Sequence, residues 1–464
     1  MLKIKDFGIK YKEKTIFEKV NLEIGRGEIV VVTGQSGCGK SSLLKAINGV
    51  ITEAGEVQIS GDIEFDGKSI LEKSISNRSR FVSTVFQNPK TQFYCINTTD
   101  ELAFALENRN IPRDKILEII EEYTEKLHTA SLLDKNIFTL SGGEKQLVAI
   151  TGAACMDNNI YIFDEPSASL DKAAIELLKK MLLGLKAMGK IIIVAEHRLY
   201  YLADIMGKLA ILHQKEMNVL KVEGTQKYLL DEIAKQYELR SFREIVKQEL
   251  SSLACNTIRL IGGNDYRNTS DLLNCDKFLA NYDQHHILDM SISFPVGINF
   301  IIGENGVGKT TFIKKLSGLS KGPGRSFWEN KRIKKNYEFI SMVMQDVNYQ
   351  LFTESVWQEI SIVSSDDELK KKVLTELDLY DKKDFHPQIL SGGEKQRLLI
   401  GLAKVSKKPI IVLDEPTSGL CKGKMMKMIN YLHEMESLGK VVIVITHDYE
   451  LIHKCGGNVF EFVR

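Results

Sequence analysis

The feature that most constrains the fold of this chain is an internal repeat. Residues 140–146 read LSGGEKQ, and the same segment returns at 390–396, 250 residues later. An Asp-Glu-Pro sequence at 164–166 returns at 414–416 with the same offset. The second copy keeps the order of the first and is shorter before its LSGGEKQ segment. A repeat of this length predicts two tandem domains that share one fold.

Short apolar runs in each copy predict the fold class. Residues 28–33 and 298–302 are apolar runs that lead into a glycine-rich turn, and a helix-forming stretch follows each turn. Apolar runs of this kind are typical of strands buried on both faces. Because they alternate with helical patterns, they predict an α/β fold with a largely parallel sheet in each domain. The other runs of this type are residues 160–163, 191–194, 410–413 and 441–445.

The domain boundaries follow from the ends of the two copies. We expect the first domain over 1–226, the second over 253–464, and a connector over 227–252. Apolar residues recur at helical spacing in this connector, which predicts that it is helical. These residues are Leu229, Ile233, Tyr237, Phe242, Val246 and Leu250.

Each copy carries a glycine-rich loop of the kind that binds phosphate. Residues 34–41 and 303–310 fit the pattern GxxxxGK[ST], in which backbone N–H groups and a helix N-terminus face an anion. The lysines would contact the β and γ phosphates, and Ser41 and Thr310 would hold Mg²⁺. A chance glycine-rich turn is the alternative, and two matches after predicted strands disfavour it. The predicted ATP ligands are Gly34, Gln35, Ser36, Gly37, Cys38, Gly39, Lys40, Ser41 and Ser42, with Gly303, Glu304, Asn305, Gly306, Val307, Gly308, Lys309, Thr310 and Thr311.

An Asp-Glu pair ends an apolar strand in each copy. Carboxylates at the carboxyl end of a parallel strand lie where α/β sheets bind ligands. Asp164 and Asp414 are the predicted Mg²⁺ ligands. Glu165 and Glu415, one residue further on, are the predicted bases that polarise an attacking water. The alternative is an acidic surface turn before proline, and the phosphate loops upstream disfavour this alternative.

These motifs together resemble the nucleotide-binding domains of ABC ATPases. The resemblance covers roughly 1–225 and 253–464, and it rests on LSGGEKQ between a Walker A and a Walker B motif in each copy. It implies tandem P-loop NTPase domains, each with an antiparallel β portion and a helical subdomain. It also implies intramolecular pairing, with the signature of one copy closing on the ATP of the other. The signature residues would be Ser141, Gly142, Gly143, Ser391, Gly392 and Gly393.

The same resemblance assigns further residues to the two ATP sites. Gln87 and Gln345 match the Q-loop, which implies contacts to Mg²⁺ or the attacking water. His197 and His447 match the switch histidine, although a histidine with a purely structural role is the alternative for each. The aromatic residue that stacks on adenine corresponds to Tyr11 and Tyr282, for which an ordinary strand tyrosine is the alternative.

One motif departs from the family pattern. The first copy has Asp171 in its D-loop, whereas the second has Cys421 in the corresponding place. A thiol does not carry this charge at neutral pH unless its pKa is strongly lowered. We therefore expect the two ATP sites to be unequal, with neither inactive.

Segments beside the Q-loops resemble the ATPases of energy-coupling factor (ECF) importers. Residues 87–92 read QNPKTQ, residues 100–108 read DELAFALEN, and residues 344–356 and 196–199 resemble the fused ATPases of this group. The resemblance implies a transmembrane coupling subunit, a membrane protein that captures a vitamin or metal ion, and a location on the cytoplasmic face of the membrane. Phe104 and Phe352 are then candidates for surfaces that grip the partner. The alternative reading places such residues in the core.

Two other functions remain open at this stage. One is a tandem ABC ATPase acting on ribosomes or nucleic acid, similar to the ABC-F group, and the other is the ATPase of a conventional ABC transporter. The net charge of +1 and the short connector of mixed charge disfavour a nucleic-acid partner. The longest apolar runs are far below the roughly 20 residues of a membrane helix. Seven scattered cysteines without a CxxC pair favour a reducing compartment.

Overall fold

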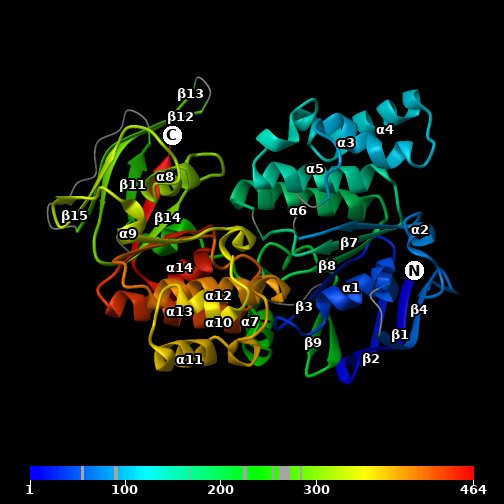
Figure 1. The fold of residues 1–464 in the computed structure, drawn as a ribbon. Helices are drawn as coiled ribbons and strands as arrows, with labels where there is room; N and C mark the ends of the chain where they lie inside the picture. Colours follow the sequence, from blue (N-terminus) through cyan, green and yellow to red (C-terminus); the bar gives the residue numbers. More distant parts are fainter. Residues whose placement is uncertain are drawn as a thin grey trace. The chain divides into compact units, whose positions relative to one another are not determined.

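The computed structural model describes residues 1–53, 57–87, 92–168, 170–222, 227–252, 255–260, 272–282 and 285–463. The chain divides into two compact units, one of residues 1–244 with 419–424 and one of 245–418 with 425–464 (Figure 1). Most of each unit is one copy of the sequence repeat, and each unit is described by itself below.

The first unit is built on a six-stranded sheet that is parallel except at one edge. Each predicted strand forms within a residue of its predicted position, because β-branched and aliphatic side chains fill both faces of the sheet. Only the edge strand β10 runs antiparallel to its neighbour. The strand order is β10 (Glu216–Lys221), β9 (Lys208–His213), β3 (Ile29–Gly34), β8 (Ile191–Ala195), β7 (Ile160–Asp164) and β6 (Val82–Val85).

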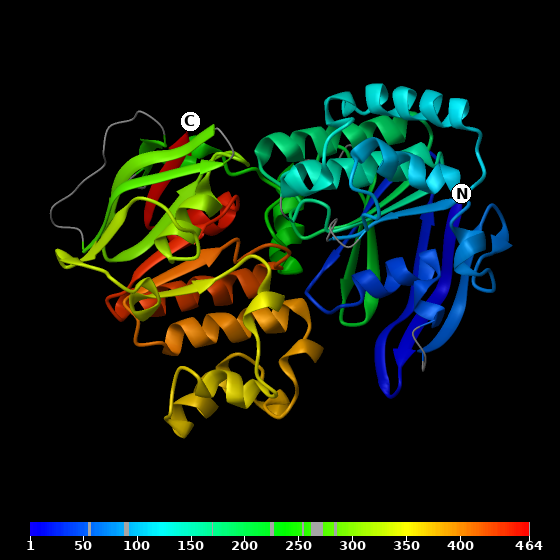
Figure 2. The same ribbon diagram turned by 45° about the horizontal axis from the view of Figure 1, so that its top comes forward.

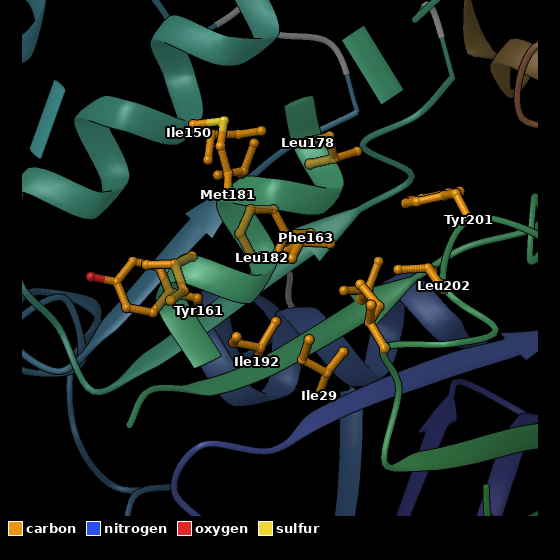
Figure 3. Close-up of a cluster of buried hydrophobic side chains, with 14 of the residues drawn as sticks. Ile29, Ile150, Tyr161, Phe163, Leu178, Met181, Leu182, Ile192, Tyr201 and Leu202 are labelled. Atoms are coloured by element: carbon orange, nitrogen blue, oxygen red, sulfur yellow. The ribbon is translucent and has the colours of Figure 1, made fainter. Parts of the chain in front are cut away.

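Alternation along the central strands divides the core of the first unit into two layers. Ile29 and Ile192 pack on one face, where α5 (Gly142–Cys155) and α6 (Lys172–Ala187) cover the sheet. Figure 3 shows this layer, with Phe163 of β7 pointing toward Leu182 of α6. The intervening residues, such as Val30, face the opposite layer with α1 (Lys40–Asn48). Strand β3, which leads into the first phosphate loop, is therefore held by apolar contacts on both of its faces.

An antiparallel sheet and a helical region complete the first unit. The antiparallel sheet has the order β2 (Lys14–Ile24), β1 (Leu2–Tyr11), β4 (Val57–Phe65) and β5 (Lys68–Ser69). The helices α3 (Thr98–Glu107) and α4 (Arg113–Lys126) pack against α5 (Figure 2). The short elements are η1 (Val50–Glu53), α2 (Ile75–Arg78), η3 (Ala130–Leu132) and η4 (Ile137–Thr139).

The second unit repeats this plan with a different edge. Its parallel sheet has the order β11 (Cys255–Arg259), β20 (Asn458–Val463), β14 (Gly297–Ile302), β19 (Val441–Ile445), β18 (Ile410–Asp414) and β17 (Ile340–Val343), and every neighbouring pair is parallel. The antiparallel sheet runs β13 (His285–Phe294), β12 (Leu273–Tyr282), β15 (Arg325–Trp328) and β16 (Lys331–Arg332).

The helices of the second unit match those of the first in order. Helix α8 (Lys309–Leu316) follows the phosphate loop, and α10 (Val356–Ser361) and α11 (Asp367–Glu376) pack against α12 (Gly392–Val405). The remaining helices are α9 (Asn336–Phe339), η6 (Val347–Gln350), η7 (Tyr380–Lys382), η8 (Pro387–Ile389), α13 (Lys422–Ser437) and α14 (Tyr449–Cys455). These sheets and helices confirm the predicted α/β class with two tandem domains.

The connector differs from the prediction of a helical segment over 227–252. Only α7 (Lys227–Gln236) and the 3₁₀ turn η5 (Lys247–Ser252) are helical. Glu238 has a φ of +52°, which ends α7 in the left-handed region, and the N–H of Leu239 donates back to the carbonyl of Ala234. Leu239 and Phe242 are buried in the core of the first unit. The apolar spacing of the later residues therefore reflects individual packing contacts and not a second α-helix.

Within the described ranges, no helix combines the length and the apolar character that a membrane crossing requires.

Candidate nucleotide-binding sites

The phosphate loops turn sharply because glycine occupies positions that no other residue could take. Gly34 ends β3 with a φ of +147°, and a Cβ there would lie 2.3 Å from the carbonyl oxygen of Leu212. Gly303 ends β14 with a φ of +143°, and a Cβ would lie 2.4 Å from the carbonyl oxygen of Phe462. A side chain would force the loop away from the neighbouring strand. The first glycine of the pattern therefore permits each loop to lie close to the neighbouring strand.

The first loop holds its lysine beside the predicted switch histidine. Lys40 is 5% exposed, and its Nζ lies 3.0 Å from Nε2 of His197. The same Nζ is 3.4 Å from the carbonyl oxygens of Gly34 and Gln35. Burial lowers the pKa of His197 well below its usual value, and the charge of Lys40 lowers it further. A neutral imidazole can accept a hydrogen bond from the lysine, so the structure brings these two predicted residues together.

The second loop holds its lysine in a different way. Nζ of Lys309 donates to the carbonyl oxygens of Gly303 and Glu304 at 2.7 and 2.8 Å. The histidine of this unit contacts the loop itself, since Nε2 of His447 lies 3.0 Å from Oδ1 of Asn305. The lysines and histidines predicted from the repeat are therefore adjacent to the loops in both units, with different partners.

The predicted magnesium ligands lie at the ends of two matched strands. In the first unit Ser41 Oγ donates to Oδ1 of Asp164 at 3.3 Å, so a hydroxyl and a carboxylate meet at one point. Burial raises the pKa of Asp164, and burial raises the pKa of Asp414 to about 6. Hard oxygen ligands of this kind suit Mg²⁺, and a cation would favour the ionised forms. The residues present fit a magnesium ion.

The two predicted bases share an unusual backbone conformation. Glu165 has a φ of +49° and Glu415 a φ of +50°, both in the left-handed region that residues other than glycine rarely adopt. A hydrogen bond to the next strand holds each one, from the N–H of Glu165 to the carbonyl of Ala195 at 2.8 Å and from that of Glu415 to Ile445 at 2.9 Å. Strain of this kind is retained where the surrounding structure requires it, which is typical of functional sites.

The side chain of Glu165 lies among the other predicted catalytic groups. The Nε2 of Gln87 donates to its Oε2 at 2.7 Å, and Nε2 of His197 lies 3.5 Å from its Oε1. Burial raises the pKa of Glu165 to about 8, and the charge of Glu196 adds to this effect. A carboxylate with a raised pKa is a stronger base than a solvated one. In its ionised form Glu165 can therefore accept a proton from a water molecule.

The predicted base of the second unit is also buried beside its histidine. Oε1 of Glu415 lies 3.7 Å from Nε2 of His447, and Glu415 is 8% exposed. Gln345, the second Q-loop glutamine, is exposed.

The signature serines begin helices in both units. Ser141 caps α5 and Ser391 caps α12, and each forms a capping box with the glutamate three residues later. Gly142 and Gly392 are exposed at these helix starts. In the second unit burial opposes ionisation of Glu394, but the hydrogen bonds from Lys382 and Ser391 prevail and lower its pKa to about 2. Both signatures thus present a serine and backbone N–H groups at a rigid helix start.

The structure describes the predicted adenine-stacking tyrosines and the segments around the first Q-loop and D-loop only in part. Tyr11 ends β1 and is half-buried, and Tyr282 ends β12 at the matching hairpin, with its side chain outside the described residues. Residues 88–91 of the QNPKTQ segment and Ser169 of the first D-loop also lie outside the described residues.

Comparison with known proteins decides the family. The family model described as "ABC transporter" matches residues 17–168 and 288–418, which lie one in each unit. This chain belongs to the ABC transporter family. A protein of Treponema denticola named as an ABC transporter ATP-binding protein is 34% identical, over 97% of this chain and 93% of the relative. A protein of the same name from Sulfurisphaera tokodaii is 30% identical, over 100% of this chain and 96% of the relative.

Solved structures show the same fold. The RNase-L inhibitor aligns with a TM-score of 0.57 and 20% identity, over 97% of this chain and 86% of that one. A model of ribosome-bound archaeal Pelota and ABCE1 aligns with a TM-score of 0.64 and 20% identity, over 97% of this chain and 74% of that one. At this identity the likeness shows the fold alone.

One buried carboxylate beside the first ABC site was missed as a site residue from the sequence. Glu196 is 2% exposed and follows β8. Its Oε2 accepts from the hydroxyls of Ser167 at 2.7 Å and Tyr201 at 3.0 Å, and its Oε1 accepts from the N–H groups of His197 at 2.7 Å and Arg198 at 3.1 Å. It therefore fixes the backbone at the predicted switch histidine and at the residue after it. In the sequence, the only signal at Glu196 was the resemblance of residues 196–199, EHRL, to the fused ATPases of ECF importers.

The surroundings of the two predicted bases differ chemically. The second copy has Thr446 at the position of Glu196, so no carboxylate stands there. The first D-loop aspartate, Asp171, caps α6 through the N–H of Ala174, whereas Cys421 takes the matched position in the second copy. These differences support the expectation that the two sites are unequal.

We expect Glu165→Gln and Glu415→Gln, made singly, to lower steady-state ATP turnover by amounts that differ by about threefold or more. The two predicted bases have different surroundings, because Glu165 lies near the charge of Glu196, whereas the uncharged Thr446 takes the matched position in the second copy. Turnover at saturating Mg²⁺ and ATP measures the difference. Equal losses within error would argue against a functional role for the two departures.

Proposed function

We propose that this ABC protein is the ATP-hydrolysing, energy-coupling subunit of an ECF-type membrane importer for a vitamin or metal ion. The observation that carries the proposal is a pair of matched, exposed aromatic side chains that follow the two predicted Q-loop glutamines. Tyr94 is 77% exposed and Phe352 is 79% exposed, and they are 258 residues apart, the same offset as Gln87 and Gln345. Exposed apolar residues that recur at one place in a repeated fold favour a binding surface.

The surroundings of these loops support a surface that grips a partner. Phe104 is half-buried and stacks on Tyr94, with ring centroids 4.9 Å apart and planes 18° apart. Ile362, the residue that matches Phe104 in the second copy, is 65% exposed. Phe352 is therefore not a core residue, while Phe104 supports an exposed ring from below. The two surfaces differ in composition, which suits a membrane partner with two unlike coupling helices.

The chemistry we propose follows the placement of the predicted residues. The loop N–H groups with Lys40 and Lys309 would bind the ATP phosphates. Ser41, Asp164 and Gln87 in one site, and Thr310, Asp414 and Gln345 in the other, would hold Mg²⁺, which when bound offsets phosphate charge. Glu165 and Glu415 would take a proton from the attacking water.

The rest of each proposed site comes from the other half of the chain. The signature Ser141, Gly142 and Gly143 would close on ATP held by Lys309, and Ser391, Gly392 and Gly393 on ATP held by Lys40. Tyr11 and Tyr282 would stack on adenine, and His197 and His447 would contact the γ-phosphate.

The proposed partners are membrane proteins. One is a transmembrane coupling subunit, and the other is a separate membrane protein that captures the solute. The relatives named as ABC transporter ATP-binding proteins support a transporter. We place the chain on the cytoplasmic face of the membrane, with no nucleic-acid partner.

A charge placed on the exposed loop tests this proposal. Phe352→Asp is expected to remove most of the chain from membranes and to lower solute uptake, because the charge would be desolvated at the interface. Its melting temperature and basal ATPase activity are expected to stay near those of the wild type, since the side chain is exposed. Leu319→Asp is the matched control, because Leu319 is 62% exposed in the same unit after α8.

Membrane fractionation, ribosome sedimentation and uptake assays of the tagged full chain separate the outcomes. Wild-type protein that sediments with ribosomes and not with membranes would support the ribosome-acting alternative. Equal membrane recovery of Phe352→Asp and Leu319→Asp would contradict the role given to the loop.

A further inference from the structure

The exposed loop of the second unit is fastened to its surroundings by polar side chains that the ATP chemistry does not use. The loop runs from Gln345 through η6 to Thr353 and carries Tyr349, 71% exposed, and Phe352, 79% exposed. Exposed aromatic side chains give a loop little packing of their own. Two other apolar side chains of the loop, Val347 and Leu351, are buried, and hydrogen bonds supply the rest of its attachment.

The first fastening is Glu359 of α10. This residue is only 2% exposed, although it is charged. Its Oε2 accepts from the N–H of Phe352 at 3.1 Å and from the N–H and the hydroxyl of Thr353 at 3.0 and 2.6 Å. One buried carboxylate oxygen thus holds the end of the loop against the following helix.

The second fastening is Gln350, which holds the beginning of the loop. Its Oε1 accepts from the N–H of Met344 at 2.7 Å, and its Nε2 donates to the carbonyl of Met342 at 2.8 Å. Met342 belongs to β17, and Met344 immediately precedes Gln345. The side chain of Gln350 therefore ties the loop back to the two residues just before Gln345 that it contacts.

A third contact joins the same loop to the signature helix. Lys395 of α12 is 7% exposed, and its Nζ donates to Oδ1 of Asn348 at 2.8 Å and to Oε1 of Gln388 at 2.9 Å. Asn348 lies in η6, between Gln345 and Phe352.

The first unit repeats the glutamate fastening at the matched positions. Glu101 of α3 accepts on Oε2 from the N–H groups of Tyr94 at 2.9 Å and Cys95 at 2.8 Å. Gln92 takes the position of Gln350, and its Nε2 lies 3.4 Å from the carbonyl oxygen of Phe86. Each of these residues is 258 positions before its counterpart. The shared pattern is a glutamine before the exposed aromatic residue and a glutamate after it.

We propose that Glu359 is a positioning residue that holds the loop carrying Phe352 to the following helix, so that a displacement of Gln345 moves the exposed aromatic side chain. Glu101 holds Tyr94 to its own following helix through the matched contacts. This inference rests on the proposed function, in which the moving side chain would act on a membrane partner. A loop fastened at both ends transmits a displacement, whereas a loop released at one end absorbs it as local disorder. The glutamates accept hydrogen bonds from the loops, and neither is among the predicted ATP-binding or catalytic residues.

Amide hydrogen exchange of the isolated full chain tests this proposal without a membrane partner. We would follow the peptide over 345–355 in Glu359→Met, Glu359→Gln and wild-type protein, with and without Mg²⁺ and a non-hydrolysable ATP analogue. Glu359→Met keeps side-chain length and removes the acceptor, and Glu359→Gln keeps one acceptor oxygen. Glu368→Met is the matched control, because Glu368 is an exposed glutamate in the first turn of α11.

Glu359→Met is expected to speed exchange of this peptide at least about tenfold and to abolish its response to the nucleotide. Glu359→Gln should fall between Glu359→Met and the wild type, and Glu368→Met should match the wild type. Basal ATPase activity should stay within about twofold in all three variants.

Unchanged exchange in Glu359→Met would overturn the proposal, and so would a nucleotide response that survives in it or is missing from the wild type. If Glu359→Met fails to fold, Thr353→Val removes a single donor at the same acceptor, and an unaltered nucleotide response in that variant overturns the proposal. Failure of the wild type to associate with membranes would remove the importer function and leave the exchange results unaffected. The two failures are therefore distinguishable.

Discussion

Replacing both Glu165 and Glu415 with glutamine is expected to leave Mg²⁺–ATP binding intact and to lower turnover by at least about a hundredfold. Glutamine keeps the size of the side chain and an acceptor for the amide of Gln87, which lies 2.7 Å from Glu165. It cannot take a proton from water. Both residues sit at φ near +50°, a conformation that glutamine can adopt at the same cost as glutamate.

Phosphate release and equilibrium ATP binding, measured on the same preparation, check this prediction. Glu122→Gln in α4 is a suitable control, because the Glu122 side chain is 54% exposed and pairs only with Lys126 of its own helix in the contacts the structure describes. Turnover that survives in the double variant would remove the assignment of both bases. Loss of ATP binding would instead show that these carboxylates organise the site.

Replacing Lys40 and Lys309 with methionine is expected to weaken ATP binding about ten- to a hundredfold at each site, since a hydrogen bond to a charged group contributes about 1.5–3 kcal/mol. Methionine preserves the buried stem, because the lysines are only 5% and 6% exposed. The charge that would face the phosphates is lost. Unlike the glutamate variants, this pair should fail at binding and not at chemistry.

The two lysine variants should also differ from each other in stability without ATP. Lys309 donates to the carbonyls of Gly303 and Glu304 at 2.7 and 2.8 Å, which are two short bonds. Lys40 has one short contact, with Nε2 of His197 at 3.0 Å, and lies 3.4 Å from the matching carbonyls. Lys309→Met should therefore lower the melting temperature more than Lys40→Met. Calorimetric ATP titrations and thermal melts measure both effects, with the exposed Lys45→Met of α1 as control. Wild-type affinity in the lysine variants would contradict the phosphate-binding role.

The local geometry of the phosphate loops could be predicted because it depends on residues that are neighbours in the chain. Gly34 and Gly303 occupy positions that exclude a side chain, and a fixed spacing leads from each to its lysine. The parallel strands were also predictable, since runs such as 191–194 are apolar on both faces. The strand alternation that separates Ile29 from Val30 follows from the same regularity.

The connector shows where periodicity alone misleads. Apolar residues at helical spacing predicted a helix over 227–252, but the left-handed φ of Glu238 ends α7 and frees Leu239 and Phe242 to pack in the core of the first unit. Tertiary burial satisfies an apolar side chain as well as a helix face does. Spacing cannot distinguish the two outcomes.

By itself the sequence determined the α/β class, the two tandem ABC domains and the residues at the loops and strand ends, because each of these is specified by a short pattern. Only the tertiary structure decided what those residues touch. In the structure, Glu196 is buried and accepts from the N–H of His197, and Glu359 accepts from the N–H of Phe352. The side chain of Phe352 is exposed, whereas that of Phe104 is half-buried. Burial and hydrogen-bond partners come from segments far apart in the chain, so a local pattern carries no record of them.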